Sequence, residues 1–347
     1  MAPLKDKHIA LIYAGGTIGM ARTAQGYAPM PEFDRVLPEL LGQAPDLPRF
    51  SLHAYAQPID SSNATPADWQ RVAHDIADRY SDFDGFVVLH GTDTMAYTAS
   101  ALSFMLQGLR KPVILTGSQI PLGEPGSDAL PNLLGALRYA ASETLQEVAI
   151  YFGRRLLRGN RAVKTSSTAL QAFDTPNYPY LAQERLSLTQ DDTGRALLNT
   201  ALLLPRATQE RFELPSYDSG RIHALRFTPG MPLSLVKAVL DLPTQALVLE
   251  CYGAGNAPDR EPALLEILAN GAARGIVIAA CSQCAHGGVA PGTYATGSAL
   301  VRAGVVGAGD MTFEALFAKL HHLFALGLSP EEVCAGLTRD LSGELSA

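Results

Sequence analysis

Hydrophobic runs alternate with amphipathic segments along most of the chain. Three runs are continuously apolar, a pattern typical of parallel strands that helices cover on both faces; they are 85–89, 112–115 and 275–280. Segments between such runs carry apolar residues at helical spacing, for example the one that begins at Pro66. This alternation predicts an α/β protein.

Cap signals place two helix starts. Thr65 precedes a proline and has Asp68 three residues further on, and Ser329 likewise precedes a proline and has Glu332. A hydroxyl at the cap and an acid at the third helical position satisfy the free amides of a helix start. We therefore expect helices to begin directly after these two cap residues.

The periodicity fades and polar residues dominate from about Gln183 to Gly220. This stretch is the best candidate for a linker, and a length of 347 residues suits two domains. We predict an N-terminal catalytic α/β domain over 1–195, a linker over 196–220 and a smaller C-terminal α/β domain over 221–347.

The composition excludes several classes of protein. Hydrophobic residues make up 47% of the chain and charged residues 18%, which describes a globular protein and not a disordered one. The net charge of −7 comes without acidic or basic blocks, so we expect neither a nucleic-acid partner nor a membrane surface. The first apolar run stops at Gly15, too early for a signal peptide, and no run is long enough to cross a membrane. We expect a soluble, cytoplasmic protein.

Cysteine and histidine patterns do not predict a metal site. The four cysteines are too few for a disulfide scaffold. Cys281 and Cys284 form a C-x-x-C pair, but no second pair follows at ligand spacing, so we expect free thiols that are buried or half-buried. His321 and His322 also lack a second ligand pair.

The chain breaks twice from a buried-looking strand into glycine and threonine. The first break follows residues 8–13 and contains Gly16 and Thr17; the second follows residues 85–89 and contains Gly91 and Thr92. The carboxyl ends of strands in open α/β sheets are where ligands bind. Two such ends suggest one site built around hydroxyl chemistry.

These motifs allow more than one chemistry. A threonine hydroxyl needs a neighbouring base to act as a nucleophile, and glycines let backbone amides approach an oxyanion closely. A phosphate-binding loop is the alternative, but the spacing G-G-T-I-G matches neither the dinucleotide fingerprint nor the lysine-bearing phosphate loop. The predicted sheet is thus the only feature that suggests a nicotinamide-dependent oxidoreductase, and the missing fingerprint argues against one. Asp93 is suited to orient a substrate ammonium, to position a base, or to cap the helix that begins near Thr94.

Other polar residues near strand ends have both functional and structural interpretations. His90 is more often a packing or hydrogen-bonding group than a catalyst at such a place. Lys164 lies near four arginines that would favour its action as a base, although a solvated basic loop is the better explanation of this stretch taken alone. Ordinary turn chemistry explains Ser61, Ser62 or Ser118 taken singly. Their value is that they point to the same edge of one sheet.

With these residues in view, the chain resembles the bacterial-type L-asparaginases, and in particular their cytoplasmic type I branch. The resemblance covers nearly the whole chain, and its two threonine motifs are highly specific. The motifs that carry it are 14–20, 60–62, 90–95, 116–121, 158–164 and 252–256.

The resemblance implies a fold and a reaction. It implies a larger N-terminal domain with a mixed, mostly parallel sheet flanked by helices, and a smaller C-terminal α/β domain with a parallel sheet. The implied reaction hydrolyses the side-chain amide of L-asparagine to L-aspartate and ammonia, with weak L-glutaminase activity, without a metal or cofactor. It also implies self-association as a homodimer or a homotetramer. A catalytically inactive amino-acid-binding sensor on the same fold is the alternative.

The same resemblance assigns roles to the catalytic residues. It makes Thr17 the nucleophile and places Tyr27 on a mobile loop that closes over it. Thr92, Asp93 and Lys164 form a second catalytic group in which Lys164 tunes Thr92. Which threonine attacks first stays open.

Substrate-binding roles follow in the same way. Ser61, helped by Ser62, would hold the α-carboxylate, and Asp93 would hold the α-ammonium. The backbone carbonyl of Ser118 would contact the substrate amide. Backbone donors near the nucleophile would stabilise the oxyanion, which places Gly16, Gly91 and Thr92 among the binding residues.

Two positions depart from the family pattern. Ser62 stands where many secreted relatives carry glutamine, so the carboxylate end of the pocket differs. Some cytoplasmic relatives bind asparagine at an effector site that uses an arginine where this chain has Glu250, and an acid there would repel a carboxylate. Cys284 resembles another effector-site position, but Glu250 argues against that site.

Overall fold

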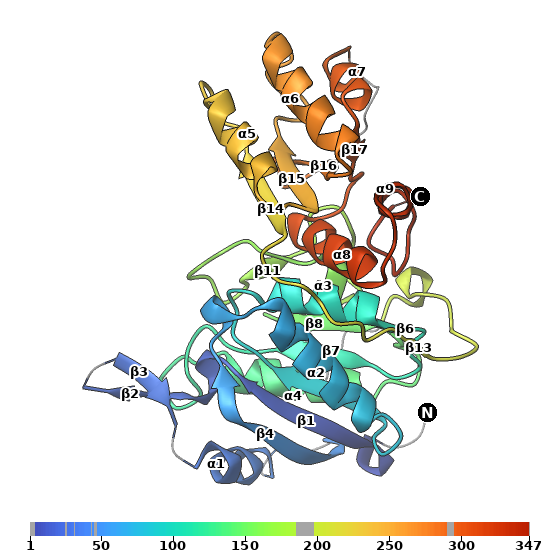
Figure 1. Cartoon of the computed structure of the whole chain (residues 1–347). Coiled ribbons are helices and arrows are strands. Elements are labelled where there is room, and N and C mark those ends of the chain that lie inside the picture. Colours follow the sequence, from blue (N-terminus) through green and yellow to red (C-terminus); the bar gives the residue numbers. More distant parts are fainter. Residues whose placement is uncertain are drawn as a thin grey trace. The chain divides into compact units, whose positions relative to one another are not determined.

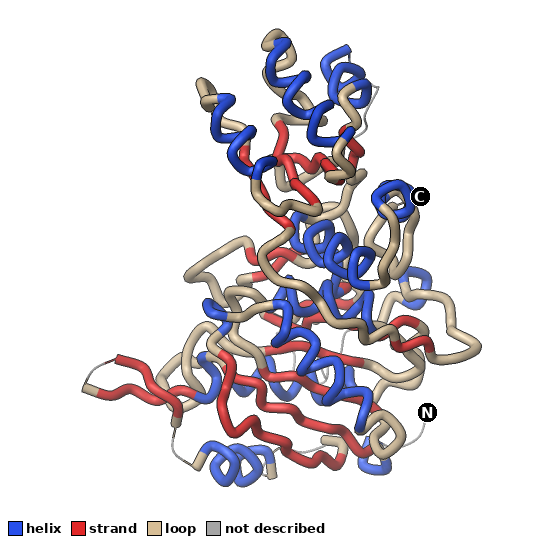
Figure 2. The backbone as a smooth tube through the Cα atoms, viewed as in Figure 1, coloured by secondary structure: helices blue, strands red, loops and turns tan. Residues whose placement is uncertain are grey.

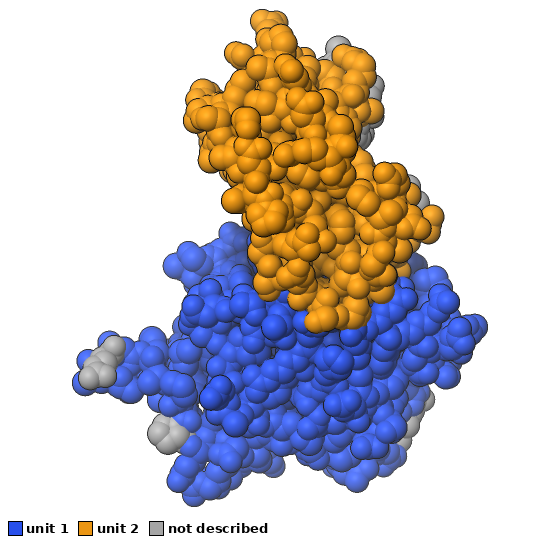
Figure 3. Space-filling model, in the orientation of Figure 1, with its two compact units in different colours: residues 1–214 blue, residues 215–347 orange. Residues whose placement is uncertain are grey.

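A computed structural model describes residues 4–24, 26–30, 32–42, 44, 47–184, 198–289 and 295–346 (Figure 1). Contacts within the chain divide it into two units, Met1–Leu214 and Pro215–Ala347 (Figure 3). Each unit is described by itself below. The predicted domain end at 195 and the first two residues of the predicted linker lie outside the described residues.

Unit 1 is built on a mixed sheet with the strand order β12-β9-β8-β7-β5-β1-β4. The strands from β8 to β4 in that order run parallel, whereas β9 and β12 each pair antiparallel with their neighbour. Their bounds are β1 His8–Gly15, β4 Arg49–Ile59, β5 Gly85–Leu89, β7 Val113–Thr116, β8 Val148–Phe152, β9 Arg155–Arg158 and β12 Ala182–Gln183. The predicted mostly parallel sheet is confirmed.

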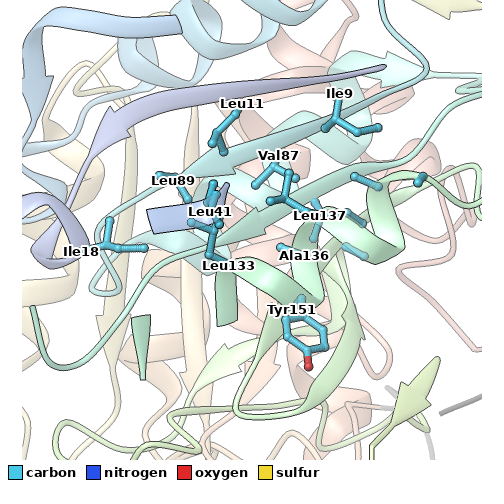
Figure 4. Packing of buried hydrophobic residues seen from close by; sticks show 14 of the residues in the cluster. Ile9, Leu11, Ile18, Leu41, Val87, Leu89, Leu133, Ala136, Leu137 and Tyr151 are labelled. Carbon is cyan, nitrogen blue, oxygen red and sulfur yellow. The ribbon is translucent and has the colours of Figure 1, made fainter. Parts of the chain in front are cut away.

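Helices cover both faces of this sheet. They are α1 Phe33–Leu41, α2 Pro66–Asp78, α3 Met95–Met105 and α4 Ala129–Ala140. Side chains of α1 and α4 share one core cluster with Leu11 of β1 and Leu89 of β5. Figure 4 shows Leu133, Ala136 and Leu137 of α4 near Val87 of β5. Figures 1 and 2 show α2 lying over the sheet, and α2 packs against α3.

Short elements connect this framework. The 3-10 turns are η1 Leu4–Asp6, η2 Thr17–Gly19, η3 Ser61–Asn63, η4 Gly159–Arg161 and η5 Thr200–Leu202. The short strands are β2 Met20–Thr23, β3 Gly26–Pro29, β6 Leu106–Gln107, β10 Val163–Lys164, β11 Phe173–Asp174 and β13 Arg211–Phe212. β2 and β3 form an antiparallel hairpin where the sequence indicated only a loop, and Figure 1 shows it standing away from the sheet.

Unit 2 contains a parallel sheet with the order β14-β15-β16-β17. Its strands are β14 Ile222–Arg226, β15 Ala246–Cys251, β16 Val277–Ser282 and β17 Val305–Gly307. Its helices are α5 Leu233–Asp241, α6 Pro262–Ala273, α7 Ala295–Arg302, α8 Phe313–Ala325 and α9 Pro330–Leu337. Core clusters on both faces of the sheet are built from alternate strand residues. The predicted parallel sheet of the C-terminal part is confirmed.

Both predicted helix starts are confirmed. Thr65 with Asp68, and Ser329 with Glu332, form capping boxes at the starts of α2 and α9. In each box the acid accepts a hydrogen bond from the amide of its cap residue, at 2.8 Å. Local side-chain chemistry is sufficient to set these two boundaries.

Candidate active site

Glycines let the loops that carry Thr17 and Thr92 touch each other. Gly16 follows β1 with a φ of 99°, and Gly91 comes two residues after β5. A Cβ atom added to Gly16 would lie 2.5 Å from the amide nitrogen of Gly91, so a larger residue does not fit. The two Gly–Thr breaks therefore meet at one edge of the sheet of unit 1.

The end of β4 packs into the same place. Ser61 is buried, and a Cβ atom on Gly91 would overlap its side chain. The backbone carbonyl of Ser61 accepts a hydrogen bond from the Thr94 hydroxyl at 2.7 Å. Ser61 is thus held against the second threonine motif.

Ser62 is exposed and bonded to its own turn. Its amide and its hydroxyl both donate to Asp60 Oδ1, at 3.0 and 2.9 Å. These hydrogen bonds hold the pKa of the Asp60 carboxyl below its usual value. Asp60 therefore caps η3 as a carboxylate and sets the direction of the turn that presents Ser61 and Ser62.

Thr92 and Asp93 share one lysine. Lys164 Nζ donates to Thr92 Oγ1 at 2.8 Å and to Asp93 Oδ1 at 2.7 Å. Thr92 is buried, whereas the Asp93 side chain is 62% exposed and that of Lys164 is 18% exposed. The structure thus brings together the three residues of the predicted second group, although 72 positions separate Thr92 from Lys164.

The basic stretch before Lys164 is solvated only at its start, where Arg154 is exposed. Arg158 and Arg161 are buried. Arg158 Nε donates to Glu147 Oε2 at 2.6 Å, and both guanidinium groups lie over the ring of Tyr178. These two arginines are therefore part of the buried interior of unit 1, just before β10.

Gln119 is a site residue to which sequence reasoning gave no role. Its Oε1 accepts a hydrogen bond from Thr92 Oγ1 at 3.3 Å, and its Nε2 donates to the carbonyl of Ala169 at 3.2 Å. Gln119 lies within the 116–121 motif, and this position was the sequence feature that could have identified it as a site residue.

Ser118 lies in the same loop and is buried. Its hydroxyl has no hydrogen-bond partner among the residues that the structure describes. Behind the loop, the buried Asp128 accepts from the amides of Gln119 and Ile120 at 3.0 Å, and Asn132 Nδ2 donates to the carbonyl of Gly117 at 3.0 Å. These hydrogen bonds with Asp128 and Asn132 therefore hold the backbone on both sides of Ser118 in place.

Thr17 and Tyr27 lie apart from this hydrogen-bonded group. Thr17 is half-buried at the start of η2, and its hydroxyl makes no hydrogen bond to a described residue. Tyr27 lies on β3 and is 51% exposed, and no hydrogen bond joins it to Thr17 in the described part of the chain. Closure of Tyr27 over Thr17 stays a prediction.

His90 has a structural role in this arrangement. Its Nδ1 donates to the carbonyl of Gly91 at 2.8 Å, which leaves Nε2 to accept from Thr98 Oγ1 at 3.0 Å. Burial lowers the pKa of His90, so the ring is neutral. With both nitrogens occupied, His90 shapes the second threonine loop.

Two family models match the chain at these residues and beyond. The model described as Asparaginase, N-terminal matches residues 8–192, and the model described as Glutaminase/Asparaginase C-terminal domain matches residues 221–336. The chain belongs to the asparaginase family.

Individual members of the asparaginase family are similar over their full length. The chain is 44% identical to L-asparaginase 1 of Escherichia coli (strain K12), over 99% of both chains. The crystal structure of L-asparaginase I from Vibrio cholerae has a TM-score of 0.88 at 40% identity, covering 98% of this chain and 99% of that one. The thermostable L-asparaginase from Thermococcus kodakarensis has a TM-score of 0.87 at 32% identity, with the same coverage. The resemblance to the type I branch is confirmed.

The thiols of this asparaginase-family chain are free, as predicted, but they differ in exposure. Cys251 and Cys281 are buried, and burial raises the pKa of each to about 12. Cys284 is exposed, contrary to expectation; it lies two residues beyond the end of β16, and its amide donates to Ser282 Oγ. Glu250, which stands where some cytoplasmic relatives carry an arginine, forms an ion pair with Arg226, with 3.2 Å between Oε1 and Nη1.

The described residues show neither a metal-ligand cluster nor a membrane-spanning helix. No group of three or more His, Cys, Asp or Glu residues is arranged to hold a metal ion in the described part of the chain. No described helix is both long enough and apolar enough to cross a lipid bilayer.

Proposed function

We propose that the protein hydrolyses the side-chain amide of L-asparagine to L-aspartate and ammonia through a threonine acyl-enzyme. The observation that carries the proposal is the contact between two Gly–Thr loops, one of which bonds its threonine to Lys164. The relatives named L-asparaginase, at 44% and 40% identity, support it.

In the first step, Thr17 Oγ1 attacks the amide carbon of the substrate. The bond from carbon to nitrogen breaks, the threonine proton reaches the leaving nitrogen, and ammonia departs. An ester between aspartate and Thr17 remains. The Thr17 hydroxyl has no hydrogen bond within the described chain that it would have to give up first.

In the second step, water attacks the ester carbon and one of its protons returns to the Thr17 oxygen as the ester bond breaks. The Thr92 hydroxyl relays a proton in these transfers. Lys164 donates to Thr92 Oγ1, which stabilises negative charge on that oxygen while its proton is away. Asp93 holds the lysine through its Oδ1.

The ends of the substrate are assigned to the remaining predicted residues. Lys164 occupies only one of the two Asp93 oxygens, so an exposed carboxylate oxygen is left for the α-ammonium. Ser61 and Ser62 would hold the α-carboxylate at the end of β4. The carbonyl of Ser118 and the amides around Gly16 and Gly91 would surround the reacting amide.

Ammonia release tests the proposal. We expect the wild-type protein to release ammonia from asparagine and, more slowly, from glutamine, and we expect Thr17→Ala and Thr92→Val each to abolish release. Near-normal rates in both variants would refute the assignment. Calorimetric binding of asparagine by a wild-type protein that releases no ammonia would favour the sensor instead.

We also propose that the protein works as a homodimer or homotetramer in the cytoplasm. The similarity over 99% of both chains to L-asparaginase 1 motivates this proposal. Light scattering on the protein as it elutes from a size-exclusion column would give the mass of the assembly. A mass of 36.9 kDa, that of a single chain, at assay concentration would contradict the proposed oligomer.

A further inference from the structure

Gln119 connects Thr92 to the chain segment that follows Lys164. The side-chain nitrogen of Gln119 donates to the carbonyl of Ala169, a group that only accepts hydrogen bonds. This contact settles which way the amide faces, since a flipped amide would set two acceptors against each other. Gln119 Oε1 therefore faces Thr92 and accepts from its hydroxyl.

Ala169 belongs to the hairpin that carries Lys164. β10 pairs antiparallel with β11, with Lys164 opposite Phe173. Inside the turn, Ser166 Oγ accepts from the amide of Ala169 at 2.9 Å. The hairpin thus reaches Thr92 by two routes, directly through Lys164 and indirectly through Gln119.

The hydrogen bonds give the Thr92 hydroxyl a direction. The Lys164 ammonium only donates, so the Thr92 proton has to point to another acceptor. Gln119 Oε1 is that acceptor. Its distance of 3.3 Å is longer than an ordinary bond between hydroxyl and oxygen, so it orients the proton without holding it strongly.

We propose that Gln119 is a positioning residue that sets the Thr92 hydroxyl and keeps the Lys164 hairpin in register with it. The proposal rests on the proposed function, because it assigns Gln119 a part in the same reaction. Gln119 is itself well fixed, since Asp128 accepts from its backbone amide with both carboxylate oxygens, each at 3.0 Å.

Steady-state kinetics with asparagine test this role. Gln119→Met keeps the length of the side chain and removes both hydrogen bonds, so kcat should fall about tenfold while KM changes less than about threefold. Gln57→Met is the matched control, because Gln57 is exposed on β4 and should leave both constants unchanged. A wild-type kcat in Gln119→Met, or a loss confined to KM, would overturn the proposal.

Gln119→Glu repeats the test with a polar side chain of the same size. It keeps an oxygen towards Thr92, but as a carboxylate it cannot donate to Ala169, so kcat should again fall. Wild-type kcat in a folded Gln119→Glu would show that the link to the hairpin has no part in turnover.

A double-mutant cycle separates positioning from general damage. If Gln119 acts through Lys164 and Thr92, adding Gln119→Met to Lys164→Met should lower the residual rate by less than about twofold. A further tenfold loss would mean that Gln119 acts independently. A wild-type protein without asparagine turnover would refute the proposed function, whereas an active wild type with an equally active Gln119→Met would refute this inference alone.

Discussion

Replacing Lys164 by methionine should separate catalysis from folding. Methionine has a similar length and lacks the ammonium, so the change deletes two hydrogen bonds, of 2.8 Å to Thr92 and 2.7 Å to Asp93. The buried Thr92 hydroxyl keeps Gln119 as a partner. The Asp93 carboxylate is 62% exposed, so water replaces the lost lysine there.

The structure sets different magnitudes for the two effects. An ion pair with an exposed partner contributes about 0–1 kcal/mol to stability, so the midpoint of thermal unfolding should fall by no more than about 3 °C. A group that assists proton transfer contributes about 10²–10⁴ to the rate. We therefore expect kcat/KM for asparagine to fall at least a hundredfold in Lys164→Met.

Ammonia release and thermal unfolding, measured on the same preparation, check this expectation. Lys237→Met is the control, because Lys237 forms an exposed ion pair with Asp241 on α5 and should leave the rate unchanged. A rate within about threefold of wild type would remove Lys164 from the machinery. A low rate with a thermal midpoint that falls by 10 °C or more would mean that the loss comes from unfolding.

Three further perturbations have definite outcomes. Gly16→Ala sets a Cβ atom 2.5 Å from the Gly91 nitrogen, so the rate of ammonia release should fall at least a hundredfold. Gly26 also has a positive φ but has open space around it, so Gly26→Ala should lower stability by only about 1 kcal/mol. Equal effects of the two variants on ammonia release would contradict this expectation. Lys319→Met leaves Glu344 without its ion-pair partner where both side chains are 0% exposed, so urea unfolding should show a loss of about 3–5 kcal/mol, and a loss below about 1 kcal/mol would contradict it. Burial raises the pKa of Glu314 to about 7, so the folded state holds a proton that the unfolded state releases near pH 4.5, and stability falls as pH rises between these values. Glu314→Gln should therefore raise the thermal midpoint more at pH 8 than at pH 5, and an equal change at both would refute the assignment.

Features set by neighbouring residues were predictable from the sequence. The helix starts at 66 and 330 depend on a cap and an acid within four positions, and both capping boxes are present. The apolar run at 85–89 coincides with the buried strand β5, and the run at 275–280 overlaps β16 from Val277 onwards, because a parallel sheet covered on both faces needs such runs.

Features set by distant partners were not predictable in the same way. The basic stretch allowed a solvated loop, and only the fold shows that Glu147 and the Tyr178 ring receive Arg158. Gln119 reaches Thr92 across 27 positions, and no local pattern encodes that contact. The hairpin of β2 and β3 was missed because its four-residue strands are largely exposed and carry little apolar alternation.

Ser61 and Ser62 are adjacent, and the sequence alone could not tell their roles apart. Turn chemistry explained Ser61 and Ser62 equally well from the sequence. The fold buries Ser61 against Gly91, whereas Ser62 stays exposed and bonds to Asp60. We therefore expect the loss of the Ser61 hydroxyl to affect asparagine binding more than the loss of the Ser62 hydroxyl.

The hydrogen bonds of the two threonines favour an order of action. The oxygen of Thr92 accepts from an ammonium, and its proton is directed at Gln119, so one of its lone pairs and its proton are engaged. A hydroxyl whose oxygen already accepts from an ammonium and whose proton already has an acceptor must give up an existing hydrogen bond in order to attack. The hydroxyl of Thr17 has no such partner among the described residues and lies beside Gly16, whose backbone meets the second loop. We infer that Thr17 attacks first and that Thr92 keeps its bonds in order to move protons, which is a task that an oriented hydroxyl beside a lysine performs well.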